Sequence, residues 1–396
     1  MKSFNILFLT LMVTVSSNLN AQVKPTVSPT PNPTADIRET FLKTKTTSIG
    51  VVSLKTQKEL DVAAKLMQDG RHEESVTAWT TIIKTNPKLT IAYNNRGYSY
   101  MLLEKLDLAI HDFNTSLKMS PLAITYSNRG MALSKKGEFE NALADYGRAI
   151  QLNPKESLAY NNRADAYLRM NKFELALVDQ NKAISILPKE ALYLSNRCFT
   201  NLKLKSFEAA ISDCNQSIEL SPKAAAAYIN RGLAYFGVGS LESALDDFDA
   251  SLKLNAALLQ VYLDRGYILN QLDRSEEALE SFNKFINAYP QTAMAYMFRA
   301  SAYAKLNKTD LELADYNKGI EMEPTNAVFY NNRGIHFVRT GNNSGALNDF
   351  NKAIELNPKL IAAYRNRAYL HAQIGEKEKA KEDEKTAETL EKVPVD

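Results

Sequence analysis

The chain contains 396 residues, with 48 Lys or Arg against 45 Asp or Glu and a net charge of +3. This near balance argues against a nucleic-acid-binding protein, which would carry a basic footprint. Two cysteines are too few for a disulfide scaffold or a Cys-based zinc module, and the four histidines lie far apart with no ligand spacing. Length alone predicts two or three domains, provided that the sequence holds no repeats.

Residues 1–21 have the layout of a secretory signal peptide. Lys2 supplies the positive start, residues 4–15 are apolar, and Ala21 is a small residue at the expected cleavage point. The apolar stretch is about twelve residues long, whereas spanning a bilayer takes about twenty. We therefore expect cleavage after Ala21 and an exported protein, periplasmic or secreted, without stable membrane insertion of the mature chain. The alternative is an uncleaved membrane anchor.

Residues 22–55 connect this leader to the rest of the chain. Residues 22–35 hold four Pro and three Thr. Such a composition cannot bury enough apolar surface to fold and is typical of an extended tether. Residues 36–55 are expected to be a weakly structured lead-in.

The remainder of the chain repeats one unit. A Tyr-x-Asn-Arg-Gly fragment at residues 93–97 recurs with variation, and seven of the eight spacings between its arginines are 34 residues and one is 33. These arginines are Arg96, Arg129, Arg163, Arg197, Arg231, Arg265, Arg299, Arg333 and Arg367. A proline such as Pro87 or Pro121 closes most units, where it ends a helix.

Residues 90–122 show the pattern inside one unit. Counted from Thr90 as position 1, apolar or small residues fall at positions 4, 8 and 11 and again at positions 20, 24 and 27. Steps of three and four predict one face of an α-helix. A turn near position 15, often Gly, separates two helices. Each unit is therefore an antiparallel helix pair that buries its apolar face by stacking on its neighbours.

This pattern resembles the tetratricopeptide repeat (TPR) in its period, its small residues at positions 8 and 20, its aromatic residue at 24 and its proline at 32. The resemblance covers residues 56–391 and implies an all-α fold, a right-handed α-solenoid of about ten stacked helix-turn-helix units. The units start near residues 56, 90, 123, 157, 191, 225, 259, 293, 327 and 361, and residues 392–396 form a tail. The chain departs from the family in having Tyr at position 4, where Trp is commonest, and Arg at position 7, where Leu is common.

The arginine at position 7 lies on the packed stripe and needs a partner there. Position 23 is Asp in most units, and in the first unit Val62 and Ala78 replace both charges together. We therefore predict a repeated Arg–Asp bridge between packed helices; the alternative is separate solvated charges. Arg265 is an exception, because its unit has Ser281 at position 23, although Glu280 is adjacent.

The two cysteines fall in the same unit. Cys198 replaces the small residue at position 8, and Cys214 replaces the aromatic residue at position 24. These positions face each other across the helix pair, and export permits oxidation. A disulfide and a pair of buried thiols both fit this placement.

A binding surface follows from the family resemblance, which implies that the first helix of each pair lines a concave groove through positions 2, 5, 6, 9, 12 and 13. An asparagine ladder occupies position 6, where each amide offers a donor and an acceptor to the backbone of an extended peptide. Its members are Asn95, Asn128, Asn162, Asn196, Asn230, Asn332 and Asn366. The alternative is that Asn is only a soluble default at this position.

The middle of the groove differs, because Asp264 and Phe298 interrupt the ladder. Apolar groove positions there form a candidate binding patch, made of Ile229, Leu233, Phe236, Leu263, Tyr267, Met294, Met297 and Phe298. Tighter packing between neighbouring first helices is the alternative. Basic residues flank the patch and suit acidic side chains or a C-terminal carboxylate: Lys135, Arg169, Lys203, Lys305, Arg339 and Arg365.

No catalytic constellation stands out in the sequence, which has no Gly-rich phosphate loop, nucleophile elbow or metal-ligand cluster. We therefore expect a non-enzymatic interaction module, without cofactor or metal, that binds a protein or peptide segment in its groove. The alternative is an envelope assembly or structural scaffold that uses its convex face and its N-terminal tether.

Overall fold

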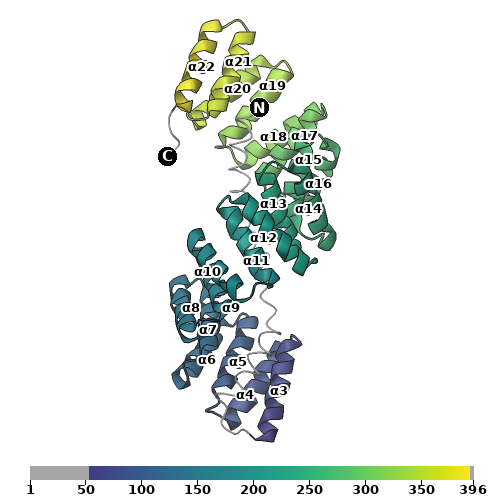
Figure 1. Ribbon diagram of the computed structural model, residues 1–396. Coiled ribbons are helices and arrows are strands. Elements are labelled where there is room, and N and C mark those ends of the chain that lie inside the picture. Colours follow the sequence, from purple (N-terminus) through teal and green to yellow (C-terminus); the bar gives the residue numbers. More distant parts are fainter. Residues whose placement is uncertain (1–52, 393–396) are drawn as a thin grey trace. The chain divides into compact units, whose positions relative to one another are not determined.

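The computed structural model describes residues 53–392, and this part of the chain is all α-helical, with twenty helices and no strand. Within each of the two compact units described below, consecutive helices pack as antiparallel helix-turn-helix pairs (Figure 1). The predicted all-α repeat solenoid is thereby confirmed. The predicted signal peptide, the tether up to residue 52 and the last four residues lie outside the described residues.

The helices follow the predicted period. The first helices of the ten pairs are α3 (Leu54–Gln68), α5 (Thr90–Leu102), α7 (Ala123–Lys136), α9 (Ser157–Arg169), α11 (Ala191–Lys203), α13 (Ala225–Gly237), α15 (Leu259–Gln271), α17 (Ala293–Lys305), α19 (Ala327–Arg339) and α21 (Ile361–Gln373). The second helices are α4 (His72–Thr85), α6 (Leu106–Met119), α8 (Phe139–Leu152), α10 (Phe173–Ile186), α12 (Phe207–Leu220), α14 (Leu241–Leu254), α16 (Ser275–Ala288), α18 (Thr309–Met322), α20 (Asn343–Leu356) and α22 (Lys377–Glu391). None of these helices is both long and apolar enough to cross a membrane.

The chain divides into two compact units, one ending at Val238 and the other beginning at Gly239. Unit 1 contains α3 to α13 and unit 2 contains α14 to α22. The boundary falls in the turn inside one helix pair, between α13 and α14. The 34-residue period of the sequence continues through this turn, so the period does not reveal the boundary.

The core of most pairs depends on close contact between a small residue at position 8 and an aromatic ring at position 24; the exceptions at position 24 are Gln180, Cys214 and Glu384. A Cβ atom placed on Gly97 would lie 2.9 Å from Cε1 of Phe113, and one on Gly334 would lie 2.5 Å from Cε1 of Phe350. Both rings are completely buried. The small residue at position 8 is therefore needed for two helices to approach across an aromatic ring, since interiors leave no room for an added methyl group.

The turn between paired helices places position 15 in the left-handed region. Glycine occupies it in half of the pairs, as at Gly137 with φ 85°. The other pairs have a non-glycine residue with φ between 55° and 59°: Glu104, Asn171, Lys205, Asp273 and Asn307. Such residues carry a conformational cost of about 1 kcal/mol or more, so a side chain at position 15 calls for a compensating contact.

The tyrosine at position 4 connects consecutive units. The Tyr93 hydroxyl donates to the carbonyl of Pro87 at 3.2 Å, and the Tyr330 hydroxyl donates to the carbonyl of Pro324 at 3.1 Å. The guanidinium of Arg96 also lies 5.8 Å from the centroid of the Tyr93 ring. A phenol reaches the proline carbonyl that closes the previous unit, which gives a physical reason for Tyr at this position.

Cys198 and Cys214 form a disulfide between α11 and α12, with their Cα atoms 5.6 Å apart. Both residues are completely buried, and they pack with Ala210 and Ala234. The covalent bond stands at positions 8 and 24, where most other pairs have a contact between a small residue and an aromatic ring. Of the two alternatives that the sequence left open, the structure shows the disulfide.

Candidate peptide-binding face

The arginine at position 7 joins the two helices of its own unit, as predicted. In the second pair, Arg96 Nε and Nη2 donate to the two carboxylate oxygens of Asp112 at 2.7 and 2.8 Å. This hydrogen bonding raises the pKa of Arg96, and the Asp112 side chain is only 2% exposed. The same two-pronged contact joins Arg129–Asp145, Arg163–Asp179, Arg197–Asp213, Arg299–Asp315, Arg333–Asp349 and Arg367–Asp383.

A third partner, which sequence reasoning missed, ties most of these arginines to the preceding repeat. The exception is Arg163, because the corresponding residue is Gly147, which has no side chain. Arg333 Nη1 donates to Asn317 Oδ1 at 2.7 Å, and Asn317 occupies position 25 one unit earlier. The same contact is made to Asn114, Asn181, Asn215, Asn283 and Asn351. We name the set of arginines at position 7, with their partners at positions 23 and 25, the arginine spine. The recurrence of Asn at position 25 was the signal that could have revealed it.

Arg265 keeps both kinds of contact by exchanging the partners. Its Nε donates to Asp249 at 2.5 Å, and its Nη1 donates to the hydroxyl of Ser281 at 2.8 Å. Asp249 stands at position 25 of the preceding unit, where Asn is usual, and Ser281 stands at position 23, where Asp is usual. The carboxylate that binds this arginine therefore comes from the preceding repeat, whereas in the other repeats it comes from the same repeat. The neighbouring Glu280, which the sequence suggested, is not the partner.

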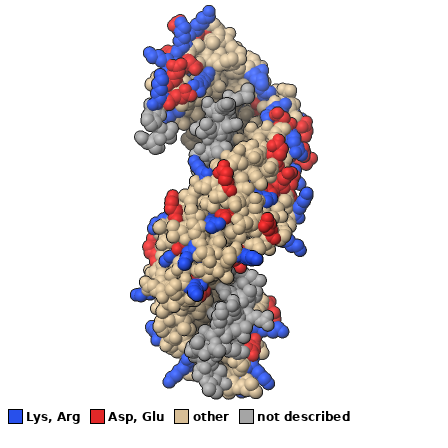
Figure 2. Space-filling view, in the orientation of Figure 1, with Lys and Arg blue, Asp and Glu red and all other residues tan. Residues whose placement is uncertain are grey.

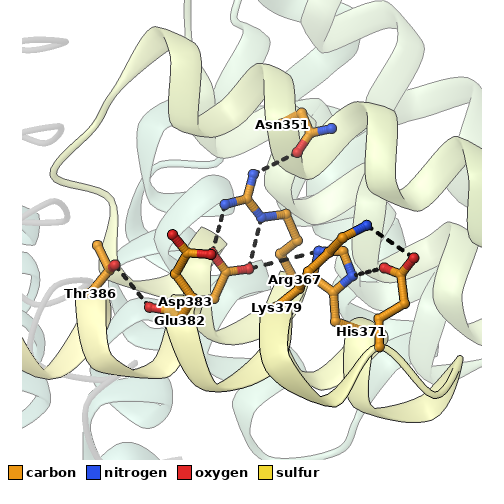
Figure 3. A network of polar contacts seen from close by, with 8 residues as sticks. Asn351, Arg367, His371, Lys379, Glu382, Asp383 and Thr386 are labelled. Carbon is orange, nitrogen blue, oxygen red and sulfur yellow. Dashed lines mark hydrogen bonds and ion pairs between the residues drawn. The ribbon is translucent and has the colours of Figure 1, made fainter.

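The C-terminal end of the spine adds a histidine (Figure 3). Arg367 from α21 lies between Asp383 of α22 and Asn351 of α20. On the next turn of α21, His371 Nδ1 lies 2.6 Å from Glu376 Oε2, and its Nε2 lies 4.0 Å from Asp383 Oδ2. Lys379 and then His371 lower the pKa of Glu376 through hydrogen bonds, against the effect of burial. The last pair is thus held by polar contacts where its outer face meets solvent.

The asparagine ladder joins neighbouring first helices. Asn128 Nδ2 donates to Asn94 Oδ1 at 3.1 Å, and Asn94 Nδ2 donates to Asn95 Oδ1 at 3.0 Å. Asn94 occupies position 5 and the other two occupy position 6. The same link runs from Asn196 to Asn161 and from Asn366 to Asn331. Part of the amide capacity at position 6 is therefore used within the chain, and peptide binding by these amides stays a prediction.

The ladder is broken where position 5 is a serine. Ser127 is completely buried and Asn162 is 7% exposed. The hydroxyl of Ser127 and Nδ2 of Asn162 have no hydrogen-bond partner. A serine side chain is shorter than the asparagine of the unbroken links, so the donor at Asn162 finds no acceptor.

Family models for the tetratricopeptide repeat match residues 91–121, 123–156, 146–178, 202–257, 263–327 and 336–375, which together are more than half of the chain. The chain belongs to the tetratricopeptide repeat family. TPR arrays are protein-interaction modules, and this chain is one of them. No curated protein matches the chain.

Solved TPR structures resemble the chain at low sequence identity. A tetratricopeptide repeat protein from Parabacteroides merdae is 23% identical, with a TM-score of 0.48, over 67% of this chain and 98% of its own. YrrB, described as a TPR protein with an unusual peptide-binding site, is 23% identical with a TM-score of 0.40, over 46% of this chain and 95% of its own. PilF of Pseudomonas aeruginosa is 19% identical with a TM-score of 0.47, over 51% of this chain and 92% of its own.

The predicted apolar patch of the TPR groove is divided between the two units. On α13 of unit 1, Ile229, Leu233 and Phe236 are half-buried. Leu233 also packs against the cluster that contains the disulfide. These three side chains fall at positions 5, 9 and 12 and share one face of the helix.

The unit 2 members of the patch contact one another. The rings of Tyr267 on α15 and Phe298 on α17 have centroids 5.3 Å apart, which is a contact between neighbouring first helices. Leu263 and Met297 are also buried, and Met294 is half-buried. This arrangement matches the packing alternative for unit 2, while binding by the patch stays a prediction.

Asp264 stands in the ladder position of α15 and is 5% exposed. Burial raises the pKa of its carboxyl to about 7. No described Lys or Arg forms an ion pair with it. A carboxyl group at an asparagine position therefore remains buried without a cation.

Most of the basic residues predicted to flank the groove have carboxylate partners within the chain. Lys135 lies 2.6 Å from Glu104, Lys305 lies 2.7 Å from Asp273, and Arg339 contacts the buried Glu312. Two further pairs are Arg169–Asp165 at 2.9 Å and Arg365–Glu391 at 2.8 Å. These contacts reduce the capacity of the five cations to attract an acidic ligand.

The charges of the described surface are mixed. Figure 2 shows Lys and Arg interspersed with Asp and Glu over the visible face, without a large area of one sign. Within residues 53–392, no group of three or more His, Cys, Asp or Glu side chains is arranged to hold a metal ion.

Proposed function

We propose that this TPR protein binds an extended peptide or protein segment along the face formed by the first helices of unit 1. The observation that carries the proposal is the arrangement of α13, where Ile229, Leu233 and Phe236 are half-buried on one helical face beside Asn230. Half-buried apolar side chains provide contact area for a ligand, and an adjacent amide can pair with its backbone. Family membership supports the proposal, since TPR arrays act through protein contacts.

A peptide selection with matched variants tests this proposal. Twelve-residue peptides displayed on phage are selected against the full chain, and the affinity of the selected peptides is measured by calorimetry. Ile229→Ser and Phe236→Ser are expected to weaken binding at least tenfold, because each removes apolar contact area. Leu175→Ser on α10 is the control, because Leu175 is 49% exposed on a second helix. Equal losses in the control and the α13 variants would contradict groove binding.

Substitution of Met297 and Phe298 is a poor test of the same idea. Both side chains are 4% exposed, so their truncation would leave cavities and destabilise unit 2. A loss of binding in such variants would not separate a contact role from a folding role.

A second candidate is a scaffold that uses the second helices. On α10, Leu175 is 49% exposed and Val178 is 64% exposed, three residues apart on the solvent face. An apolar pair of this kind suits contact with another protein. The same variants separate the two functions. A peptide that binds the second helices is expected to lose affinity in Leu175→Ser and to keep it in Phe236→Ser.

Export is part of the proposal, and the buried disulfide supports it, since disulfides persist in oxidising compartments. The loop that it closes has a sequence separation of 16 between the two cysteines, which corresponds to about 3 kcal/mol of stabilisation. Intact mass spectrometry of the protein isolated from its native cells is expected to show loss of residues 1–21 and two unreactive cysteines. An uncleaved chain with two alkylated cysteines would contradict export.

A further inference from the structure

Cations recur at position 13, the last groove position of the first helix. Four of the five have carboxylates of the chain within reach: Lys135, Arg169, Lys305 and Arg339. The fifth is Lys203, at the end of α11. None of the ion pairs within residues 53–392 includes Lys203.

The reason lies in the turn of the preceding unit. Lys135 and Lys305 each bind the residue at position 15 one unit earlier, which is Glu104 or Asp273. These two residues adopt positive φ, and the ion pair offsets part of the cost of that conformation. The corresponding residue for Lys203 is Asn171, which has the same positive φ but no charge. The separation from Asn171 to Lys203 equals that from Asp273 to Lys305. Lys305 also donates to the carbonyl of Asn270, and among the described residues Lys203 has neither this contact nor the carboxylate.

The surroundings of Lys203 make an uncompensated ammonium costly. Its Nζ lies 5.1 Å from the centroid of the Phe199 ring, and the residue is half-buried. Burial lowers the pKa of Lys203, which is the direction expected for an ammonium group removed from water without an anion. Phe199 is also half-buried and stands at position 9 of the same helix, another groove position. A ligand anion would therefore gain a charge partner that is already partly desolvated.

We propose that Lys203, with Phe199 beside it, forms a carboxylate-binding subsite that receives an acidic group of the segment bound along the first helices. The group is an Asp or Glu side chain or a C-terminal carboxylate, since both offer the same pair of oxygens. The subsite rests on the proposed function, because it names the chemistry of the ligand for that face. Phe199 covers one side of the ammonium, so the ligand approaches the remaining side.

The test measures the binding of three fluorescently labelled octapeptides by fluorescence anisotropy. Each peptide consists of alanine together with either glutamate or glutamine. The first contains glutamates and ends in an amide, the second contains glutamines and ends in an amide, and the third contains glutamines and ends in a free carboxylate. The full chain is expected to prefer the first or third probe to the second by about tenfold. The preferred probe identifies the source of the carboxylate. Equal binding of the three probes, including no binding, would overturn the subsite.

Matched variants assign any preference to Lys203. Lys203→Gln is expected to abolish the preference and leave the affinity for the neutral probe unchanged, whereas Lys203→Arg retains it. Lys135→Gln is the control, because that lysine is already paired with Glu104. A preference that survives Lys203→Gln would overturn the assignment. Loss of binding by the display-selected peptides would instead refute the proposed function, so the two failures are distinguishable.

A second variant fills the subsite from within the chain. Asn171→Asp places a carboxylate where Asp273 stands for Lys305, at a backbone conformation that Asp already adopts in this protein. The variant is expected to lose the carboxylate preference while its thermal unfolding temperature stays equal or rises. A full preference in Asn171→Asp, with unchanged stability, would show that residue 171 does not reach Lys203 and would overturn the comparison with Asp273 and Lys305 on which the subsite is argued.

Discussion

Two repeats of unit 2 differ both in the arginine spine and in the asparagine ladder. In the pair α19–α20, Arg333 binds Asp349 and Asn317, and in the pair α15–α16, Arg265 binds Asp249 and Ser281. The second arrangement exchanges the two kinds of partner, so both guanidinium groups are satisfied. In this repeat of the spine, the change at position 23 is matched by a change at position 25.

The ladder behaves differently in the same two repeats. Asn331 of α19 donates to Asn332 and accepts from Asn366, so the link to the next first helix is complete. In α15 the ladder position holds Asp264, a buried carboxyl without a cation. A hydrogen bond with Gln260 lowers the pKa of this carboxyl, but burial raises it by more, and no Lys or Arg among the described residues pairs with it. In these two repeats the uncompensated departure therefore lies in the ladder of the first helices, whereas the spine keeps both kinds of contact.

The largest expected effect concerns the pH dependence caused by Asp264. Its pKa in the folded chain is about 7, against 3.8 for the free side chain. Between these two values the folded state binds more protons than the unfolded state, so this carboxyl lowers stability as the pH rises from 4 to 7. Three pKa units correspond to about 4 kcal/mol. Asp264→Asn is thus expected to be more stable than the wild type at pH 8 and to match it near pH 4.

Hydrogen exchange of unit 2 between pH 5 and pH 8, corrected for the intrinsic rates, measures this difference. Asp310→Asn is the matched control, because Asp310 is an exposed carboxylate on α18. A constant difference between Asp264→Asn and the wild type across this range would mean that the buried carboxyl has an ordinary pKa.

A spine carboxylate ranks second. Asp349→Ala leaves the Arg333 guanidinium, whose side chain is 21% exposed, with Asn317 as its one remaining hydrogen-bond partner among the described residues. Removing one member of a buried pair costs about 3 kcal/mol or more, which urea denaturation and the exchange protection of α19 and α20 would report. Replacing both members, as Arg333→Met with Asp349→Leu, is expected to recover most of the loss. A cost below about 1 kcal/mol for the single variant would class the pair with surface salt bridges.

Much of the spine is predictable from the sequence, because Arg at position 7 and Asp at position 23 recur together and disappear together at Val62 and Ala78. Its third member was missed, because an asparagine on a second helix resembles an ordinary surface residue until its distance to the next arginine is known. The partners of Lys135 and Lys305 were missed for a similar reason. They lie in turns one unit away, and the period identifies the turn but gives no indication of which side chain bends back toward the neighbouring helix.

The exchange at Arg265 gives the third prediction. Asp249→Asn restores the usual residue at position 25 but removes the only carboxylate bound to Arg265, at an expected cost of about 2 kcal/mol. Adding Ser281→Asp restores the carboxylate at position 23, so the double variant is expected to return close to the stability of the wild type. The coupling between the two substitutions, measured by a double-mutant cycle, should therefore be large and favourable. Additive effects would show that the two positions act independently of Arg265.

The smallest expected effect is that of a substitution in unit 1 that restores the missing hydrogen bond of the asparagine ladder. Ser127→Asn places at position 5 the residue that Asn94 and Asn161 already provide in neighbouring units, so its amide oxygen can accept from Asn162 Nδ2. Satisfying a buried donor is worth about 1 kcal/mol, and exchange protection of α7 and α9 should rise accordingly.

Two alanine variants are the controls. Asn128→Ala, which removes the amide that donates to Asn94, should cost about as much stability as Ser127→Asn gains. Asn162→Ala in the wild type should cost less, because that amide nitrogen has no partner to lose. If Asn162→Ala is as costly as Asn128→Ala, the amide of Asn162 is already satisfied, and the ladder has no break for a ligand or a substitution to fill.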